Sequence, residues 1–215
     1  MKVEVLSYTP ITVAVQAIRT CWDSNHKSDS SLTTIGEKDK ELVHRVGNKF
    51  KHSSTLEHCS IVFKIEGVSR ALLQEMARHR MANISVKSTR YTLKELKKEE
   101  PFDGWGSRAM KYLVSTGNAD VDEASVKALE ALRVILVKGI ANDKAKYCLP
   151  ESYRTSLVWT FNIRSLQNLI FLRSDKSALW EFRELIDVMM MHIPEEYLFL
   201  LEEFVYENRK AEEEG

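Results

Sequence analysis

Side chains that bind anions are concentrated between residues 77 and 91, in the stretch ARHRMANISVKSTRY. Arg78, Arg80 and Arg90 each offer a planar guanidinium that stays charged and can bind phosphate or carboxylate through two parallel hydrogen bonds. Together with the hydroxyl of Ser88, they could form a cradle for a phosphate. The alternative is that basic residues near a helix end complement the helix dipole and extend into solvent.

Two other polar stretches suggest ligand contacts. His52, Glu57 and His58 lie within KHSSTLEHCS, but their spacing matches no strong zinc signature, so polar contacts are favoured over a metal site. In NIRSLQNLIFLR, Arg164 and Asn168 are four residues apart and can share one helix face. Such a face suits hydrogen bonding to a heterocycle, although it could equally be an exposed polar helix side.

The composition excludes several classes of protein. The 31 basic residues balance the 31 acidic ones, which argues against general binding of polyanions. No G-x-G-x-x-G, phosphate-loop or G-x-S-x-G pattern occurs. Cys21, Cys59 and Cys148 are odd in number and widely spaced, which favours a reducing cytoplasm over a disulfide framework. The first residues lack the apolar run of a signal peptide, and no apolar stretch is long enough to span a membrane.

The periodicity of apolar residues predicts an α+β fold. Residues 2–7, 61–65 and 155–163 have strand composition, residues 84–91 are expected to form an ordered turn, and residues 98–106 a loop. Helices are expected over residues 11–22, 38–50, 69–80, 164–173 and 178–189, around Val126, Leu129, Leu132 and Leu136, and in a last segment through Phe204. In the helix over residues 38–50, Leu42, Val43, Val46 and Phe50 recur at helical spacing and should share its inner face. Few strands without regular β-α-β alternation argue against a doubly wound sheet. We expect one domain over residues 1–208 and a charged, disordered tail over residues 209–215.

The arginine-rich stretch fits a narrower pattern. Arg78-His79-Arg80, seven further residues and then Ser88 give R-H-R-x7-S, which resembles the signature of the flavin-dependent thymidylate synthases. HSSTLEH before this stretch and residues 145–181 after it resemble the corresponding segments of that family, in the same order. The resemblance implies a mostly antiparallel central sheet flanked by long helices.

The resemblance also implies an activity. Members of the family reductively methylate dUMP to dTMP, with 5,10-methylenetetrahydrofolate as carbon donor, NADPH as hydride source and bound FAD as cofactor. No metal and no cysteine nucleophile take part, and homotetramers build their active sites at subunit interfaces. A cytoplasmic enzyme without membrane contact is therefore expected.

Residue roles follow from the matching positions. The resemblance implies that Arg173 lies against the uracil edge, where a guanidinium would stabilise negative charge developing on O4 and N3. The implied flavin contacts are His52, Ser54, Arg78, His79, Arg80, Asn162, Arg164 and Asn168. The implied nucleotide contacts are Glu75, Arg78, Val86, Lys87, Ser88, Thr89, Arg90, Lys146 and Arg173.

Two positions depart from the family pattern. Many members have an acidic or amide side chain where this chain has Val86, which cannot form a hydrogen bond through its side chain. The position of Lys146 is often arginine, and lysine keeps the charge but loses the bidentate fork. A second hypothesis is a non-catalytic nucleotide- or RNA-binding regulator. The zero net charge disfavours nucleic acid, and Arg173, Asn168 and the Arg78–Arg80 triplet favour the enzyme.

Overall fold

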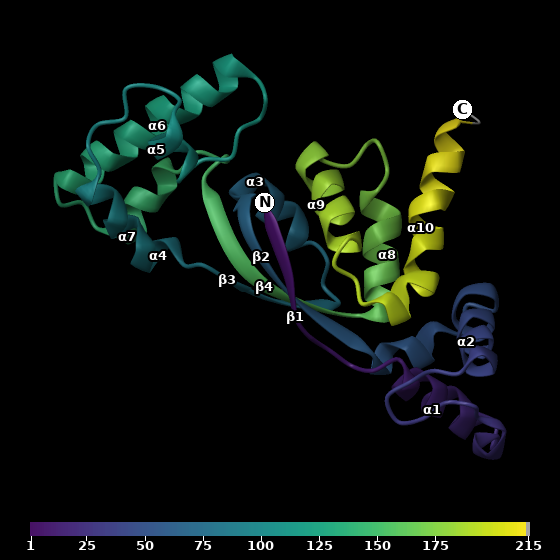
Figure 1. The fold of residues 1–215 in the computed structure, drawn as a ribbon. Coiled ribbons are helices and arrows are strands. Elements are labelled where there is room, and N and C mark those ends of the chain that lie inside the picture. Colours follow the sequence, from purple (N-terminus) through teal and green to yellow (C-terminus); the bar gives the residue numbers. More distant parts are fainter. Residues whose placement is uncertain (214–215) are drawn as a thin grey trace. The chain divides into compact units, whose positions relative to one another are not determined.

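The chain forms a four-stranded antiparallel sheet combined with many helices, as Figure 1 shows. This computed structural model describes residues 1–213, and of Ser107 and residues 206–213 only the backbone is considered. The strands are β1 (Lys2–Tyr8), β2 (Ser60–Ser69), β3 (Ala82–Val86) and β4 (Arg154–Asn162), in the spatial order β1-β2-β4-β3. The predicted α+β class with a mostly antiparallel sheet is confirmed.

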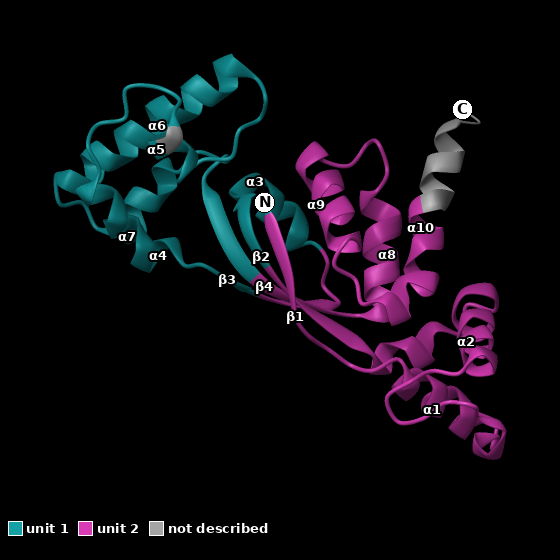
Figure 2. Cartoon of the chain, in the orientation of Figure 1, with its two compact units in different colours: residues 1, 65–78, 85–157 teal, residues 2–64, 79–84, 158–215 magenta. Residues whose placement is uncertain are grey.

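Within this fold the chain divides into two compact units (Figure 2). Unit 1 contains residues 1, 65–78 and 85–157, and unit 2 contains residues 2–64, 79–84 and 158–215. Strands β2, β3 and β4 each contribute residues to both units. The expected boundary at residue 208 remains a prediction. Residues 214 and 215 of the expected tail lie outside the described residues.

Unit 1 has its own apolar core, which is built around helix α6 (Ala119–Val137). Val126, Leu129, Leu132 and Leu136 are all buried, which confirms the predicted amphipathic helix. The Asn118 side chain caps this helix by accepting from the backbone of Asp120 and Val121. The shorter helices are α3 (Arg70–Met76), α4 (Thr89–Thr92), α5 (Ser107–Met110) and α7 (Asn142–Ala145), with 3₁₀ segments at Leu93–Lys98 and Lys146–Cys148.

Unit 2 is built from the remaining helices, and α8 (Ile163–Arg173) packs against α10 (Glu195–Glu213). Its other helices are α1 (Thr12–Cys21), α2 (Glu37–His44) and α9 (Trp180–Met190), with 3₁₀ segments at Asn25–Lys27 and Ser53–His58. Its largest fully buried side chains are those of Trp159, Tyr197, Phe63, Phe161 and Phe182. Because these aromatic rings are large and rigid, side chains that contact them are held in fixed orientations.

A buried ion pair joins α1 to α2. Asp39, which is fully buried, accepts hydrogen bonds from Arg19, Ser28 and Ser30. Burial alone would raise the pKa of Asp39, but these hydrogen bonds and the Arg19 charge outweigh it and lower the pKa from 3.8 to about 2. The carboxylate therefore organises the loop between the two helices.

Three local expectations were wrong. Residues 84–86, expected within a turn, belong to strand β3, and Arg78, His79 and Arg80 lie beyond the end of α3 rather than in its last turn. Phe50, expected on the inner face of a helix, is 60% exposed, because the chain leaves the α-helical period in a π-helical turn at Arg45–Lys49. Among the described residues, no helix is both long and apolar enough to cross a membrane.

Candidate functional site

The arginine triplet begins where α3 ends. Ser69 caps the start of this helix, its hydroxyl accepting from the backbone N–H of Leu72 at 3.0 Å. At the other end, Nη1 of Arg78 lies 3.2 Å from the Glu75 carboxylate, although the Arg78 side chain remains 70% exposed. Arg80 is also exposed. Both arginines can therefore reach a ligand outside the core.

The segment after β3 presents the hydroxyl and basic residues in a short helical turn. The backbone N–H of Lys87 donates to the Ser156 carbonyl at 2.8 Å, which continues the pairing of β3 with β4. Ser88 stands at the N-cap of α4, but its hydroxyl makes no capping hydrogen bond. Thr89 is buried, whereas Arg90 is exposed and stacks over Tyr91 at 5.8 Å. A hydroxyl and a guanidinium thus stand at the start of one helix.

The two positions that depart from the family pattern, Val86 and Lys146, both lie in unit 1. Val86 is half-buried at the end of β3, and Lys146 is half-buried directly after α7. The α7 helix is tied to α4, because Nδ2 of Asn142 donates to the Arg90 carbonyl at 2.8 Å. Lys87 instead lines a separate polar cavity of about 220 Å³ together with Lys111 and Arg154.

Helix α8 carries a polar face and a buried face, as its spacing predicted. Arg164, Asn168 and Leu172 are all exposed, so the predicted shared face of Arg164 and Asn168 is confirmed. On the opposite side Gln167 is buried and donates to Asn48 at 2.9 Å and to the Leu200 carbonyl at 3.0 Å. These bonds fix the rotation of α8 and therefore the direction of its polar face.

The last residue of α8 makes a contact that the sequence could not reveal. Nε of Arg173 donates to Nε2 of His79 at 2.9 Å, across 94 residues of chain. The Arg173 guanidinium also lies 4.9 Å from the centre of the Phe182 ring. Edge-on contacts at 5.8 Å from Phe182 and 6.3 Å from Trp159 hold the His79 ring. The predicted catalytic arginine and the central residue of the triplet are thus in direct contact.

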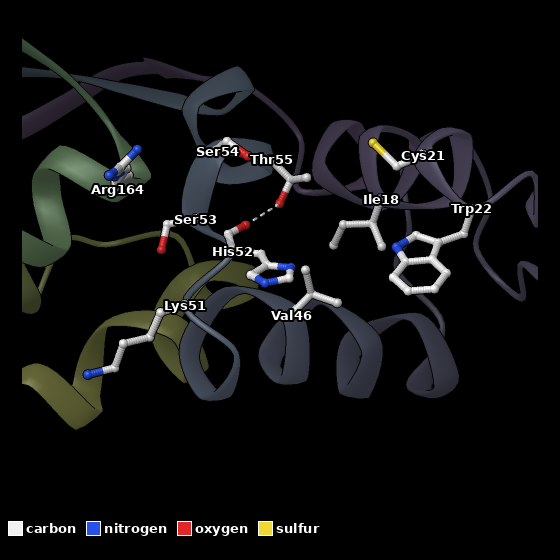
Figure 3. Close-up of a pocket in the computed structure, with 10 residues that line it drawn as sticks. All are labelled: Ile18, Cys21, Trp22, Val46, Lys51, His52, Ser53, Ser54, Thr55 and Arg164. Atoms are coloured by element: carbon white, nitrogen blue, oxygen red, sulfur yellow. Dashed lines mark hydrogen bonds between the residues drawn. The ribbon is translucent and has the colours of Figure 1, made fainter.

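A cavity of about 340 Å³ gathers three of the expected flavin contacts, His52, Ser54 and Arg164 (Figure 3). Nη1 of Arg164 donates to Oε1 of Glu57 at 2.6 Å, which holds the arginine beside the 3₁₀ segment at Ser53–His58. The cavity is also lined by Ile18, Cys21, Trp22, Val46, Lys51, Ser53 and Thr55.

The cavity wall depends on close backbone packing. Gly47 lies in the π-helical turn, and a Cβ atom there would come within 2.9 Å of Cδ1 of the fully buried Leu56. Lys51, directly before His52, has a φ of 54°, a left-handed conformation that is rare for residues other than glycine. Strained backbone of this kind is frequent at ligand sites.

Sequence reasoning missed part of this cavity. Trp22 is 72% exposed beside Cys21, and neither residue belongs to a motif. The one available signal was a tryptophan at a polar helix end, where so large an apolar side chain is unusual.

The structure brings the expected site residues together in several groups. One group contains His52, Ser54 and Arg164, a second His79 and Arg173, and a third Glu75 and Arg78. Ser88 and Arg90 form a fourth, in α4 and its N-cap. Asn162 is engaged locally, because its side-chain oxygen accepts from the backbone N–H of Ser165 at 2.8 Å and caps α8.

Other reactive groups in the described part of the chain are less suited to chemistry. Burial raises the pKa of the fully buried Cys59 thiol, which disfavours the nucleophilic thiolate. Within the described residues no three His, Cys, Asp or Glu side chains are grouped as metal ligands would be. The chemistry-bearing groups are therefore the arginines, His79 and the nearby hydroxyls and amides.

An antiparallel sheet with exposed arginines in several groups of polar residues, at Arg78, Arg80, Arg90 and Arg164, defines a protein suited to anionic organic ligands. Residues 4–197 match the family model described as thymidylate synthase complementing protein. Two curated relatives carry the name flavin-dependent thymidylate synthase. The relative from Wolinella succinogenes is 57% identical, over 93% of this chain and 97% of its own length. The relative from Campylobacter jejuni is 56% identical, over 97% of this chain and 99% of its own length.

A solved structure is equally similar. The crystal structure of thymidylate synthase X from Helicobacter pylori, which contains FAD and dUMP, is 50% identical and superposes with a TM-score of 0.90. The match covers 95% of this chain and 99% of the crystal structure's chain. The chain belongs to the flavin-dependent thymidylate synthase family, which confirms the resemblance carried by the Arg78–Ser88 stretch.

Proposed function

We propose that this protein is an FAD-dependent thymidylate synthase that reductively methylates dUMP to dTMP. The carbon comes from 5,10-methylenetetrahydrofolate and the hydride from NADPH. Family membership over residues 4–197 supports the reaction class. The observation that carries the proposal to this chain is the Arg173–His79 contact, because it holds a guanidinium on the centre of the R-H-R triplet.

The residues around the unit 2 cavity fit a flavin cofactor. A dinucleotide combines a charged pyrophosphate with planar rings and ribose hydroxyls. Arg164 and Lys51 supply positive charge, Ser54 supplies a hydroxyl, and the exposed Trp22 supplies a flat apolar surface in the same cavity. His52, Arg78, His79, Arg80, Asn162 and Asn168 are proposed as the remaining contacts. When bound, FAD would supply the two-electron chemistry that moves a hydride between NADPH and the nucleotide.

The residues proposed for dUMP divide into phosphate and base contacts. Ser88 and Arg90 at the start of α4 would hold the phosphate, with Lys146 supplying a further charge. Glu75, Arg78, Val86, Lys87 and Thr89 are proposed to line the nucleotide. Because the Val86 side chain offers no hydrogen bond, backbone groups would make the polar contacts at that position.

Arg173 is proposed to activate the uracil ring. C5 of uracil attacks a carbon electrophile only when electron density moves onto O4 and N3, and a fixed guanidinium at that edge would stabilise the developing charge. No cysteine nucleophile is then required, which agrees with the burial of Cys59. We therefore expect the combined variant Cys59→Ala, Cys148→Ser to retain turnover.

The protein is further proposed to be a cytoplasmic homotetramer with active sites at subunit interfaces. The free thiols at Cys21, Cys59 and Cys148 support a reducing compartment. The wide exposure of Arg78, Arg80 and Arg90 supports completion of each site by a neighbouring subunit, since these charged groups are otherwise left at the surface.

Oxidation of NADPH by the purified protein tests the proposed function. The protein should carry bound flavin, visible as yellow colour, and should oxidise NADPH faster when dUMP and methylenetetrahydrofolate are present, with dTMP as product. A colourless protein whose NADPH oxidation is indifferent to dUMP would instead favour the nucleotide-binding regulator.

A further inference from the structure

The His79 ring accepts a hydrogen bond from Arg173 through the lone pair of a ring nitrogen. The Arg173 Nε always carries a hydrogen, so at a separation of 2.9 Å Nε2 of His79 must act as the acceptor. The imidazole is therefore neutral, with its proton on Nδ1, since a protonated ring would turn a second donor toward the guanidinium.

Aromatic rings fix both partners of this hydrogen bond. Phe182 makes an edge-on contact with the His79 ring, with an interplanar angle of 83°, and also lies beneath the Arg173 guanidinium. Trp159, which is fully buried, also contacts the imidazole edge-on, at an interplanar angle of 69°. The His79 ring thus has little freedom to rotate, and the hydrogen bond in turn restricts the Arg173 side chain.

The hydrogen bond to His79 is donated by Nε and not by the two terminal nitrogens of the guanidinium. Those two nitrogens form the fork that binds planar acceptors through parallel hydrogen bonds. A partner at Nε sets the plane of the guanidinium and hence the direction of the fork. A long side chain at the end of α8 would otherwise sample several rotamers before binding.

We propose that His79 is a positioning residue for Arg173, a neutral acceptor that aims the guanidinium fork at the uracil edge of dUMP. This inference rests on the proposed function and adds a second task to the flavin contact assigned to His79. It gives the central residue of the R-H-R triplet a role toward the nucleotide as well as toward the cofactor.

Two amide variants separate the hydrogen bond from the imidazole itself. The side-chain oxygen of His79→Gln lies about as far from the backbone as Nε2 and can accept from Arg173, whereas the shorter side chain of His79→Asn cannot reach it. Both variants remove the ring that is proposed to contact flavin. We expect His79→Asn to raise the dUMP dissociation constant, measured with saturating FAD, by about ten- to a hundredfold, the effect of losing a hydrogen bond to a charged group. His79→Gln should recover most of that loss.

A double-mutant cycle with Arg173→Lys supplies the second measurement. Lysine has no guanidinium plane that His79 could orient. Adding His79→Asn to the Arg173→Lys variant should therefore weaken dUMP binding little further. Circular dichroism and flavin absorbance confirm folding and cofactor content of each variant.

Three results would overturn the inference: equal dUMP affinities of the glutamine and asparagine variants, additive effects in the cycle, or loss of FAD from both His79 variants. The unaltered protein serves as the control for the proposed function. If it shows no dUMP-dependent NADPH oxidation, the proposed function is wrong. If it is active but the two amide variants behave alike, only the positioning role of His79 is wrong.

Discussion

The side-chain oxygen of Asn162 accepts a hydrogen bond from the backbone N–H of Ser165 at 2.8 Å, and this bond starts helix α8. The same helix carries Arg164, Asn168 and, as its last residue, Arg173. A residue proposed to contact flavin is therefore also the N-cap of the helix that presents three other proposed site residues. Its amide NH₂ group does not take part in the cap, so the two tasks use different atoms.

Substitution of Asn162 should separate capping from flavin binding. Asn162→Asp keeps an oxygen that caps as well as asparagine, so the thermal midpoint should stay the same. Loss of the NH₂ donor and the added negative charge should weaken FAD binding, measured by flavin fluorescence. Asn162→Ala removes both groups and should also lower the free energy of unfolding by about 1 kcal/mol. Unchanged FAD affinity in the aspartate variant would remove Asn162 from the flavin site.

Arg173→Ala should leave FAD bound but reduce dTMP formation by about 10²- to 10³-fold, because a preorganised charge at the developing oxyanion is lost. Single-turnover assays with saturating dUMP measure the effect on the chemical step. Arg183→Ala is the matched control, since Arg183 is a neighbouring arginine on α9 that donates to the Lys176 carbonyl. Near-normal turnover in Arg173→Ala would refute the assigned role.

Ser88→Ala should weaken dUMP binding without loss of stability. The hydroxyl makes no capping bond in α4, so its removal leaves the helix intact, whereas one hydrogen bond to a phosphate contributes about 1.5–3 kcal/mol. Calorimetric titration with dUMP measures the change. Ser69→Ala gives the opposite pattern, because Ser69 caps α3 and should lose about 1 kcal/mol of stability with unchanged affinity.

Lys146→Arg should tighten dUMP binding. Arginine keeps the charge at the half-buried position after α7 and adds a planar fork that matches phosphate geometry. We expect a fall of about three- to tenfold in the dUMP dissociation constant. Lys144→Arg, on the exposed side of the same helix, should leave the constant unchanged. Equal behaviour of the two variants would place Lys146 outside the phosphate site.

Asp39 makes stability depend on pH in acid. Its pKa is lower in the folded protein, at about 2, than the ordinary value of 3.8, so the folded state is favoured by ionisation. This contribution, about 2 kcal/mol, is fully present above pH 3.8 and is lost as the pH falls through about 2. Urea unfolding between pH 5 and pH 2 should show the loss.

Asp39→Asn provides the comparison for that titration. The variant leaves Arg19, 8% exposed, without its carboxylate, which should cost about 3–5 kcal/mol at neutral pH. The difference in the free energy of unfolding between Asp39→Asn and the unaltered protein should become smaller in acid. Asp143→Asn, at an exposed position, serves as control. If the free energies of unfolding of Asp39→Asn and the unaltered protein changed with pH in parallel, the lowered pKa of Asp39 would be contradicted.

The elements that could be predicted from the sequence are those in which apolar residues recur at regular spacing. Leu129 and Leu132 face the core of unit 1 because a regular α-helix carries them there. Phe50 was misplaced because one π-helical turn shifts the phase of the helix before it. Strand β3 was missed although Ala82, Ile84 and Val86 alternate with polar residues, because the run is only five residues long and its apolar side chains are only half-buried.

The site residues were accessible through the family pattern, but their contacts were not. The R-H-R-x7-S spacing identified His79 and, with the downstream block, Arg173. Nothing in the sequence states that these two side chains meet, since their contact depends on the packing of α8 against distant segments and on Phe182. Trp22 was missed for the same reason, because its role as a cavity wall depends on its neighbours in space.

Gly47 has no functional group, yet a Cβ atom at this position would come within 2.9 Å of the Leu56 side chain, which is fully buried. Any larger residue must shift that side chain, which belongs to the same 3₁₀ segment as Ser54. A library of random substitutions selected for thymidine-independent growth should therefore reject almost every replacement at position 47. Intolerance to mutation at that position would report the packing of the Leu56 side chain against the π-helical turn, and it should not be mistaken for a contribution to catalysis.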